Sequence, residues 1–297
     1  MRKLRKKYPI WVSIFVTLLF PLASLVGSLP LLAWEQVWDY GEYLPTMLGE
    51  LVVLALMALV MALLRMQYVL RPGGKGVGKC LMPMLPVLLL YTYSLLGEVI
   101  LYAGEPVRPP LQILWFVLCM LSIGVTEELV FRGLITRMIF EKYGRSAVGV
   151  WLSVLVSSLL FGGVHLLNAA GGAVSIGSVL VQVVGAMALG MCLAAAYLRT
   201  NSLWAVALIH GYMDFCALLA SGVFAVNSIA GVIDEASPLQ LAAAVLYTLL
   251  AIFLLRPSQM KQITGSGQAP AQGDVIKIML AVMLASGLFS TVAVLML

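Results

Sequence analysis

The apolar stretch LQILWFVLCMLSIGVTEELVFRGL, residues 111–134, decides the fold class of this chain. A helix that crosses a bilayer needs about 20 mostly apolar residues, and the run from Leu111 to Phe131 has that length. Glu127, Glu128 and Arg132 nevertheless lie at its end. Each ionisable group at membrane depth costs roughly 2.5–3.5 kcal/mol. The stretch therefore predicts a transmembrane helix that carries a functional site.

The composition of the whole chain predicts a multi-pass membrane protein. Of its 297 residues, 62% are hydrophobic and 10% are charged, and the mean hydropathy is +1.04, far from the composition of soluble domains. We predict an all-α, polytopic membrane helix bundle of about eight to nine transmembrane helices. The candidate spans are Ile10–Trp34, Thr46–Leu64, Met82–Tyr102, Leu111–Phe131, Val148–Leu167, Ile176–Tyr197, Leu203–Phe224, Leu239–Leu255 and Ile278–Leu297.

The charges of the loops predict the orientation of the chain. Lys and Arg next to helix ends tend to stay in the cytoplasm, and the N-terminal segment MRKLRKK is strongly basic. Basic and acidic loops then alternate, which places the N-terminus in the cytoplasm. We expect an integral protein of a bacterial cell membrane whose first span is an uncleaved anchor. The net charge of +5 lies in these loops and indicates orientation, not nucleic-acid binding.

Several polar features carry no function in this interpretation. The segment GGKGVGK, residues 73–79, fits part of a phosphate-binding loop but is followed by Cys80 where Ser or Thr is needed, so we expect no nucleotide. Glu50 and Glu98 fall near the predicted interfaces, where we expect them to be solvated. The four cysteines form no metal-binding spacing and are expected to pack as small apolar residues.

The chain is expected to have three parts. Residues 1–110 form N-terminal transmembrane helices, residues 111–226 form a catalytic core, and residues 227–297 form C-terminal helices. A flexible linker rich in Gly, Ser and Gln is expected at 256–277.

Polar residues at membrane depth come in three groups. The first is Glu127, Glu128 and Arg132, and the second is FGGVHLLN, residues 161–168, with His165. The third is LIHGYMDF, residues 208–215, with His210 and Asp214. One such group alone would commonly serve helix packing. Together they match a site that activates water and stabilises an oxyanion.

Helical spacing predicts partners within these groups. Glu128 and Arg132 are four residues apart and can form an ion pair, whereas Glu127 is turned about 100° away and is left for chemistry. His210 and Asp214 share a face in the same way, which suits two metal ligands or an imidazole oriented by a carboxylate. Phe161 and His165 share a face, and Gly162 and Gly163 allow another helix to come close.

The ordered motifs EELVFR, FGGVH and HGYMD resemble those of the CPBP intramembrane proteases, also called the Abi family. That family includes CaaX prenyl endopeptidases and bacteriocin-processing relatives. The resemblance covers residues 111–224 and implies that Glu127 activates water together with His165. It further implies that His210 and Asp214 stabilise the oxyanion or hold a metal, and that Glu128 and Arg132 brace the site.

Asp214 departs from the commoner Asn of the family at its position. An ionised Asp cannot donate a hydrogen bond to an oxyanion, so here it would ligate a metal or orient His210. His165, His210 and Asp214 are the candidate ligands of a catalytic Zn²⁺, as in a metalloprotease, although no HExxH motif is present.

Two functions follow from these residues. The first is an endopeptidase that cleaves a peptide or protein with a membrane-associated end, as in CaaX or leader-peptide processing. The alternative is a non-catalytic scaffold or immunity protein that uses the polar groups for packing or binding. One difficulty concerns depth: His165 lies about 26 Å along a span that begins at Val148, far from Glu127. We therefore expect a strongly tilted fifth helix, or a segment 141–150 that follows the interface.

Overall fold

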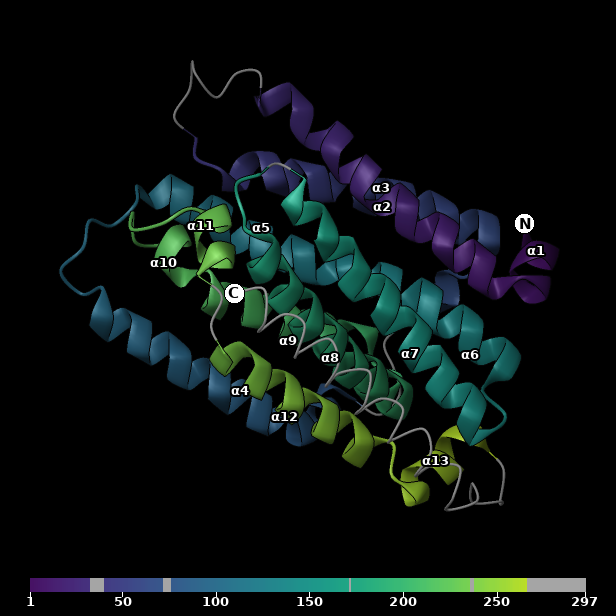
Figure 1. Cartoon of the computed structure of the whole chain (residues 1–297). Helices are drawn as coiled ribbons and strands as arrows, with labels where there is room; N and C mark the ends of the chain where they lie inside the picture. The colour runs from purple at the N-terminus through teal and green to yellow at the C-terminus, as the bar shows by residue number, and fades with distance from the viewer. Residues whose placement is uncertain (33–39, 72–75, 171, 236–237, 266–297) are drawn as a thin grey trace. The chain divides into compact units, whose positions relative to one another are not determined.

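The computed structural model describes residues 1–32, 40–71, 76–170, 172–235 and 238–265 (Figure 1). Within these ranges the regular structure is helical, and the chain has no β-sheet there. An isolated antiparallel bridge joins Val107 to Phe224. The predicted all-α fold is confirmed. Contacts between Cα atoms divide the chain into two compact units whose segments alternate along the sequence.

The first unit comprises residues 1–17, 131–201 and 233 onward. Its elements are α1 (Arg2–Lys7), the start of α2 (Pro9–Leu32), most of the π-helix η2 (Leu129–Thr136), α6 (Arg137–Tyr143), α7 (Ala147–Val164), η3 (His165–Ala169), α8 (Ile176–Thr200), α12 (Pro238–Leu254) and α13 (Pro257–Thr264). Helix α8 packs against both α7 and α12 and is the most buried of the long helices. Its small residues explain this position, since a Cβ added at Gly190 would lie only 3.1 Å from the Phe161 ring of α7.

The second unit comprises residues 18–130 and 202–232. Its elements are the rest of α2, α3 (Tyr43–Leu64), η1 (Gln67–Leu70), α4 (Gly76–Leu101), α5 (Pro110–Glu128), α9 (Leu203–Ala217), α10 (Leu219–Gly222) and most of α11 (Ile229–Asp234). Helix α5 packs against α3 and α9, and α4 packs against α9. An aromatic cluster holds α5 in place: the Phe116 ring lies 4.9 Å from Tyr43 and 5.1 Å from Phe215.

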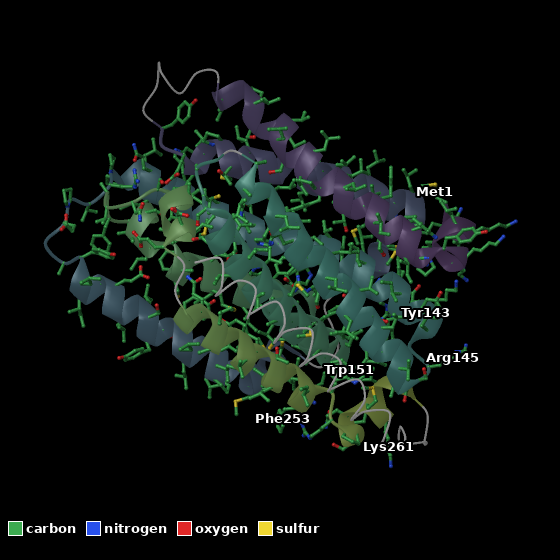
Figure 2. The ribbon with its side chains drawn as sticks, in the orientation of Figure 1. Met1, Tyr143, Arg145, Trp151, Phe253 and Lys261 are labelled. Carbon is green, nitrogen blue, oxygen red and sulfur yellow. The ribbon has the colours of Figure 1, made fainter. Side chains whose placement is uncertain are left out.

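Large apolar side chains cover the outside of several helices, as expected where lipid replaces water. On α2, Trp11, Leu18 and Leu22 are more than half exposed, and on α4 the same holds for Met82 and Ile100. Figure 2 shows Phe253 of α12 among these outward side chains. Because a soluble protein would not leave so much apolar surface in water, these faces are lipid-facing.

Six helices of the described chain are long and apolar enough to cross a membrane, and the pair α12 and α13, bent by 61°, makes up to seven. Pro257 opens α13, and proline cannot continue the α12 hydrogen-bond ladder without a break. Helix α13 occupies the first part of the predicted linker at 256–277. The predicted ninth span, Ile278–Leu297, lies outside the described residues. The count of eight to nine spans stays a prediction.

Two predicted boundaries are wrong. The fourth span does not end at Phe131, because helical structure continues through η2 and α6 to Tyr143, a run of 34 residues. A short turn then leads to Ala147, so residues 141–150 comprise the end of α6, this turn and the start of α7. That this segment follows the interface stays a prediction. The seventh span ends at Ala217, not Phe224. At 15 residues α9 is shorter than a usual span.

Candidate functional site

The close approach of α5 and α9 brings the second unit's polar residues together. A Cβ added at Gly124 would lie 2.5 Å from the Ala207 carbonyl oxygen and 2.6 Å from the Gly211 nitrogen. A Cβ at Gly211 would lie 2.8 Å from the Met120 carbonyl oxygen. Only glycine fits where two backbones are this close. The glycine contact therefore places His210 of α9 beside the end of α5.

His210 is the centre of the site and touches three carboxylates. Its Nδ1 lies 2.9 Å from Glu128 Oε1, and its Nε2 lies 3.5 Å from Glu127 Oε2 and 3.6 Å from Asp214 Oδ2. The His210 side chain is 3% exposed and that of Glu128 is fully buried, while those of Glu127 and Asp214 are 14% and 26% exposed. The site thus opens on the side of Glu127 and Asp214.

The contact with Glu128 defines the hydrogen-bonding state of His210. A carboxylate in its ionised form only accepts hydrogen bonds, and opposite that form the Nδ1–H group of His210 is the donor. Such a bond fixes the tautomer and orientation of an imidazole. The predicted pairing of His210 with Asp214 on one face of α9 agrees with their 3.6 Å contact. Helical spacing pairs Glu128 with Arg132 and does not predict that Glu128 contacts His210.

Glu50 of α3 is a further acidic residue beside α5, and its predicted solvated position is wrong. This α3 residue is 5% exposed. Its carboxylate accepts hydrogen bonds from the hydroxyls of Thr126 and Ser24, the latter at 3.2 Å. Thr126 directly precedes Glu127, so Glu50 ties α3 to α5 at the level of the site. The sequence offers one signal for these partners: a carboxylate inside an apolar span costs free energy, so it needs hydrogen-bond donors nearby.

Immediately after Glu128 the helix widens into a π-helix, Leu129–Thr136. The Thr136 hydroxyl donates to the Phe131 carbonyl oxygen five residues earlier at 2.7 Å, and the Ser157 hydroxyl donates to the same oxygen at 2.7 Å. π-helices are rare and concentrate at functional sites. They also change the angular spacing on which the predicted Glu128–Arg132 ion pair depends, and that pair stays a prediction.

Arg132 reaches α7 and α8 within the first unit. It is 1% exposed, its Nη2 donates to the Gly190 carbonyl oxygen at 3.3 Å, and its guanidinium lies 4.6 Å from the centre of the Phe161 ring. A guanidinium over an aromatic face is a cation–π contact. Arg132 therefore holds Phe161, a residue of the second predicted group, in a fixed position.

Phe161 in turn packs against His165, as their spacing predicts. The two rings meet edge to face at 5.2 Å, and His165 Nδ1 lies 3.0 Å from the Phe161 carbonyl oxygen. Because a carbonyl only accepts, Nδ1 carries the proton and Nε2 is the acceptor nitrogen of the neutral ring. His165 is half-buried at the end of α7. The predicted close approach is confirmed at Gly162, where an added Cβ would lie 2.9 Å from the Val183 carbonyl oxygen, but not at Gly163, where no atom of the described residues lies within 4 Å of an added Cβ.

The predicted ligands of a zinc ion are His165, His210 and Asp214. Among the described residues, no three His, Cys, Asp or Glu side chains are arranged to hold a metal ion. The imidazole of His210 and the three carboxylates around it form a set that is richer in hard oxygen ligands than a typical catalytic zinc site. Zn²⁺ stays a prediction.

Comparison with known proteins identifies one region of the chain. Residues 109–216 match the family model described as "Type II CAAX prenyl endopeptidase Rce1-like". This region runs from the start of α5 to the end of α9 and contains all six predicted site residues. Comparisons with curated proteins and with solved structures gave no match.

Proposed function

We propose, from the match of residues 109–216 to the family model of Rce1-like type II CAAX prenyl endopeptidases, that the chain is an intramembrane endopeptidase in which Glu127 activates the hydrolytic water. The chain has the helices of a multi-pass membrane protein. A substrate that reaches a site within such a bundle has a membrane-associated end. The prenylated CaaX peptides in the name of the family meet this condition, and so do leader peptides with an apolar segment.

The observation that carries the proposal is the group of carboxylates around one buried imidazole. Packing alone would be served by one ion pair, because each additional buried charge costs free energy. His210 instead touches Glu127, Glu128 and Asp214. Such convergence of titratable groups is typical of catalytic sites. A role in helix packing alone leaves two of the three carboxylates unexplained.

The proposed reaction uses these groups in distinct roles. Glu127, on the open side of the site, takes a proton from water, and the water oxygen bonds to the carbonyl carbon of the substrate. The carbonyl oxygen becomes an oxyanion, and His210 in its doubly protonated form donates to it through Nε2–H. Collapse of this intermediate breaks the C–N bond as Glu127 passes its proton to the leaving nitrogen. Glu128 and Asp214 orient His210 and balance its charge.

His165 is proposed to share the activation of water with Glu127. This pairing is what the resemblance of the motifs EELVFR and FGGVH implies. Both residues lie within residues 109–216, the region that matches the family model.

The test is cleavage of a defined peptide by the purified full-length protein in lipid nanodiscs. The substrate is a farnesylated peptide that ends in a CaaX sequence, with a fluorophore and a quencher on opposite sides of the scissile bond. Wild type is expected to cleave it, whereas Glu127→Gln and His165→Ala lose at least about a hundredfold in kcat. Glu98→Gln, a matched change at another glutamate in a membrane helix, is expected to keep wild-type activity.

Two further peptides define the substrate class. The same sequence without the farnesyl group tests the need for a lipid anchor, and a leader-type peptide with an apolar segment tests the broader class. Equal cleavage by wild type and Glu127→Gln would contradict the assigned base. Absence of cleavage of every peptide by a folded wild-type protein would favour the scaffold function, in which any cellular effect follows protein abundance. The same assay with a strong chelator present shows whether cleavage depends on a metal ion.

A further inference from the structure

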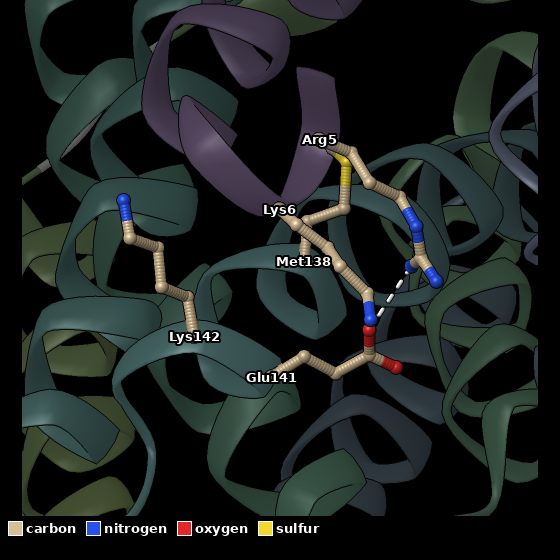
Figure 3. A pocket seen from close by; sticks show the side chains of 5 residues that line it. All are labelled: Arg5, Lys6, Met138, Glu141 and Lys142. Atoms are coloured by element: carbon tan, nitrogen blue, oxygen red, sulfur yellow. Dashed lines mark hydrogen bonds and ion pairs between the residues drawn. The ribbon is translucent and has the colours of Figure 1, made fainter. Parts of the chain in front are cut away.

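A basic cavity lies between α1 and α6 in the first unit (Figure 3). Its volume is about 410 Å³, within the range of pockets that hold small molecules. The residues that line it are Arg5, Lys6, Met138, Glu141 and Lys142. Three cations and one carboxylate therefore surround the space, and the buried Met138 gives it an apolar wall.

Glu141 already forms ion pairs with two arginines. Positive charge is therefore in excess over negative charge in the cavity. The Glu141 carboxylate lies 3.0 Å from Arg5 Nη1 and 3.3 Å from Arg137 Nε. Figure 3 shows Arg5 directed at Glu141 from across the cavity. Lys6 and Lys142 are both exposed. Lys142 Nζ donates to the Lys7 carbonyl oxygen at 2.6 Å, which uses one of its three N–H groups.

Arg5 is held firmly enough to form part of a built site. Its side chain is 7% exposed although it carries a permanent charge near the beginning of the chain. Burial of an arginine requires fixed partners, because its desolvation costs several kcal/mol. A side chain fixed in this way loses little further conformational entropy when a ligand binds, which favours binding.

The cavity lies close to the expected membrane interface. Trp11, five residues after Lys6 and at the start of α2, is 71% exposed, and Tyr8 is 44% exposed. Exposed Trp and Tyr at the end of a membrane helix mark the level of the lipid headgroups. Phe15, one turn further along α2, is exposed among the apolar residues that face the acyl chains. A cavity at Arg5 and Lys6 therefore lies at the depth of the lipid phosphates.

We propose that this cavity binds the phosphate of an anionic phospholipid headgroup from the leaflet that adjoins α1. The ligand chemistry is a phosphate diester: its oxygens accept from Lys6 and Lys142, and its glycerol part lies against Met138. Basic pockets between membrane helices bind anionic headgroups by the same combination of charge and shape. This proposal does not depend on the proteolytic function.

The experiment measures which lipids stay with the purified full-length protein. The protein is reconstituted in phosphatidylcholine with a minor fraction of phosphatidylglycerol, extracted in a mild detergent, and its retained lipids are quantified by mass spectrometry. Wild type is expected to retain phosphatidylglycerol far above its bulk fraction. The double variant Lys6→Gln with Lys142→Gln is expected to lower that enrichment about tenfold or more.

The matched control is Lys3→Gln with Arg145→Gln, which removes two exposed positive charges that do not line the cavity. Figure 2 shows Arg145 directed away from the ribbon. This control is expected to keep the wild-type enrichment, and so is Lys6→Arg with Lys142→Arg, which also checks that the site tolerates substitution. An equal loss in both glutamine pairs would overturn the proposal in favour of general surface attraction, and unchanged enrichment in the cavity pair would also overturn it.

A second arm distinguishes the lipid from a free phosphate. Inorganic phosphate is titrated into the delipidated protein in detergent and followed by calorimetry. No saturable binding is expected, because the proposed site needs the glycerol part and the depth of the membrane. Saturable binding that Lys6→Gln with Lys142→Gln abolishes would assign the cavity to a soluble phosphate compound and overturn the lipid proposal.

Discussion

Among single residues, Glu128 has the shortest contact with His210. It is fully buried and accepts from His210 Nδ1 at 2.9 Å. Glu128→Gln keeps the size of the side chain but removes the charge that balances a protonated His210. We expect kcat to fall about a hundredfold with KM nearly unchanged, because the interaction acts on the transition state. Steady-state kinetics on the farnesylated peptide checks this.

The control for Glu128→Gln is the same change at the neighbouring carboxylate, Glu127. Glu127→Gln is expected to cost more than Glu128→Gln, since it removes the proposed base. The reverse order of the two variants would show that Glu128 is the base and Glu127 its support.

Arg132 supports Phe161 through its planar guanidinium, which lies 4.6 Å from the ring centre. A lysine at this position keeps the charge but cannot stack or reach the Gly190 carbonyl oxygen in the same geometry. Arg132→Lys is therefore expected to lower the free energy of unfolding by about 1–2 kcal/mol. Thermal melting in detergent measures it. Arg137→Lys, at a less buried arginine of the same helical run, is the control, and equal melting temperatures for the two variants would contradict the prediction.

Local spacing predicts residue pairs well when both members lie on one continuous helical segment. The four-residue steps from His210 to Asp214 and from Phe161 to His165 were predicted and correspond to contacts. The partners of Glu128 and Glu50 were not predictable in this way, because they lie 82 and 76 positions away in the sequence. Spacing on a helix cannot show which face of another helix will come close.

At the scale of elements, the Gly124–Gly211 contact sets the distance between α5 and α9. A Cβ at Gly124 would meet backbone atoms that cannot move independently of α9. Gly124→Ala is expected to lower the free energy of unfolding by about 1–3 kcal/mol, as overpacking does. Its control is Gly97→Ala on α4, where no atom lies within 4 Å of the added Cβ. That change is expected to raise stability by about 0.5–1 kcal/mol.

Both glycine variants are compared with wild type by thermal melting in the same detergent. Because His210 follows the movement of α9, Gly124→Ala is also expected to lower kcat. A Gly124→Ala protein as stable as Gly97→Ala would show that α5 and α9 do not approach so closely.

Asp234, at the end of α11, connects to the start of α8. Its carboxylate accepts from the Ser175 backbone N–H at 2.7 Å, and this bond lowers the pKa of Asp234 below its usual value. A lowered pKa in the folded protein stabilises it above the usual pKa of about 3.9, and that stabilisation is lost as pH falls through the lowered value. We expect Asp234→Asn to melt below wild type at neutral pH.

Melting curves recorded between neutral and acid pH check the sign of this effect. The two melting temperatures are expected to converge as the pH falls below the usual range of Asp titration. A difference that stays constant with pH would mean that the Asp234 charge does not contribute.

The predicted helix bounds agree with the structure where the length of the apolar stretch determines them. They differ where contacts with residues distant in the sequence determine them. The first three spans, the fifth and the sixth begin and end within a few residues of their predicted bounds, apart from the earlier start of α4 at Gly76. The break after Ala217 depends on remote partners, since Arg108 and Tyr43 both bond to Ser221 in the next short helix. Nothing near residue 217 in the sequence signals those bonds.

At the scale of the whole molecule, the orientation of the chain in the membrane is the prediction still to be tested. The basic N-terminus predicts a cytoplasmic start. Helices α2, α3 and α4 are each long enough to cross, so three crossings separate Lys3 from Glu105. An odd number of crossings places these two residues on opposite sides. Lys3 is therefore expected in the cytoplasm and Glu105 outside.

The native cysteines make this prediction simple to measure. All four are buried, so an introduced cysteine is labelled above a low background. Intact cells that carry Lys3→Cys or Glu105→Cys are treated with a membrane-impermeant maleimide, and permeabilised cells serve as the control. Glu105→Cys is expected to label in intact cells and Lys3→Cys only after permeabilisation. The opposite pattern would place α1 and its basic cavity on the outer leaflet and reverse the side from which a substrate enters the site.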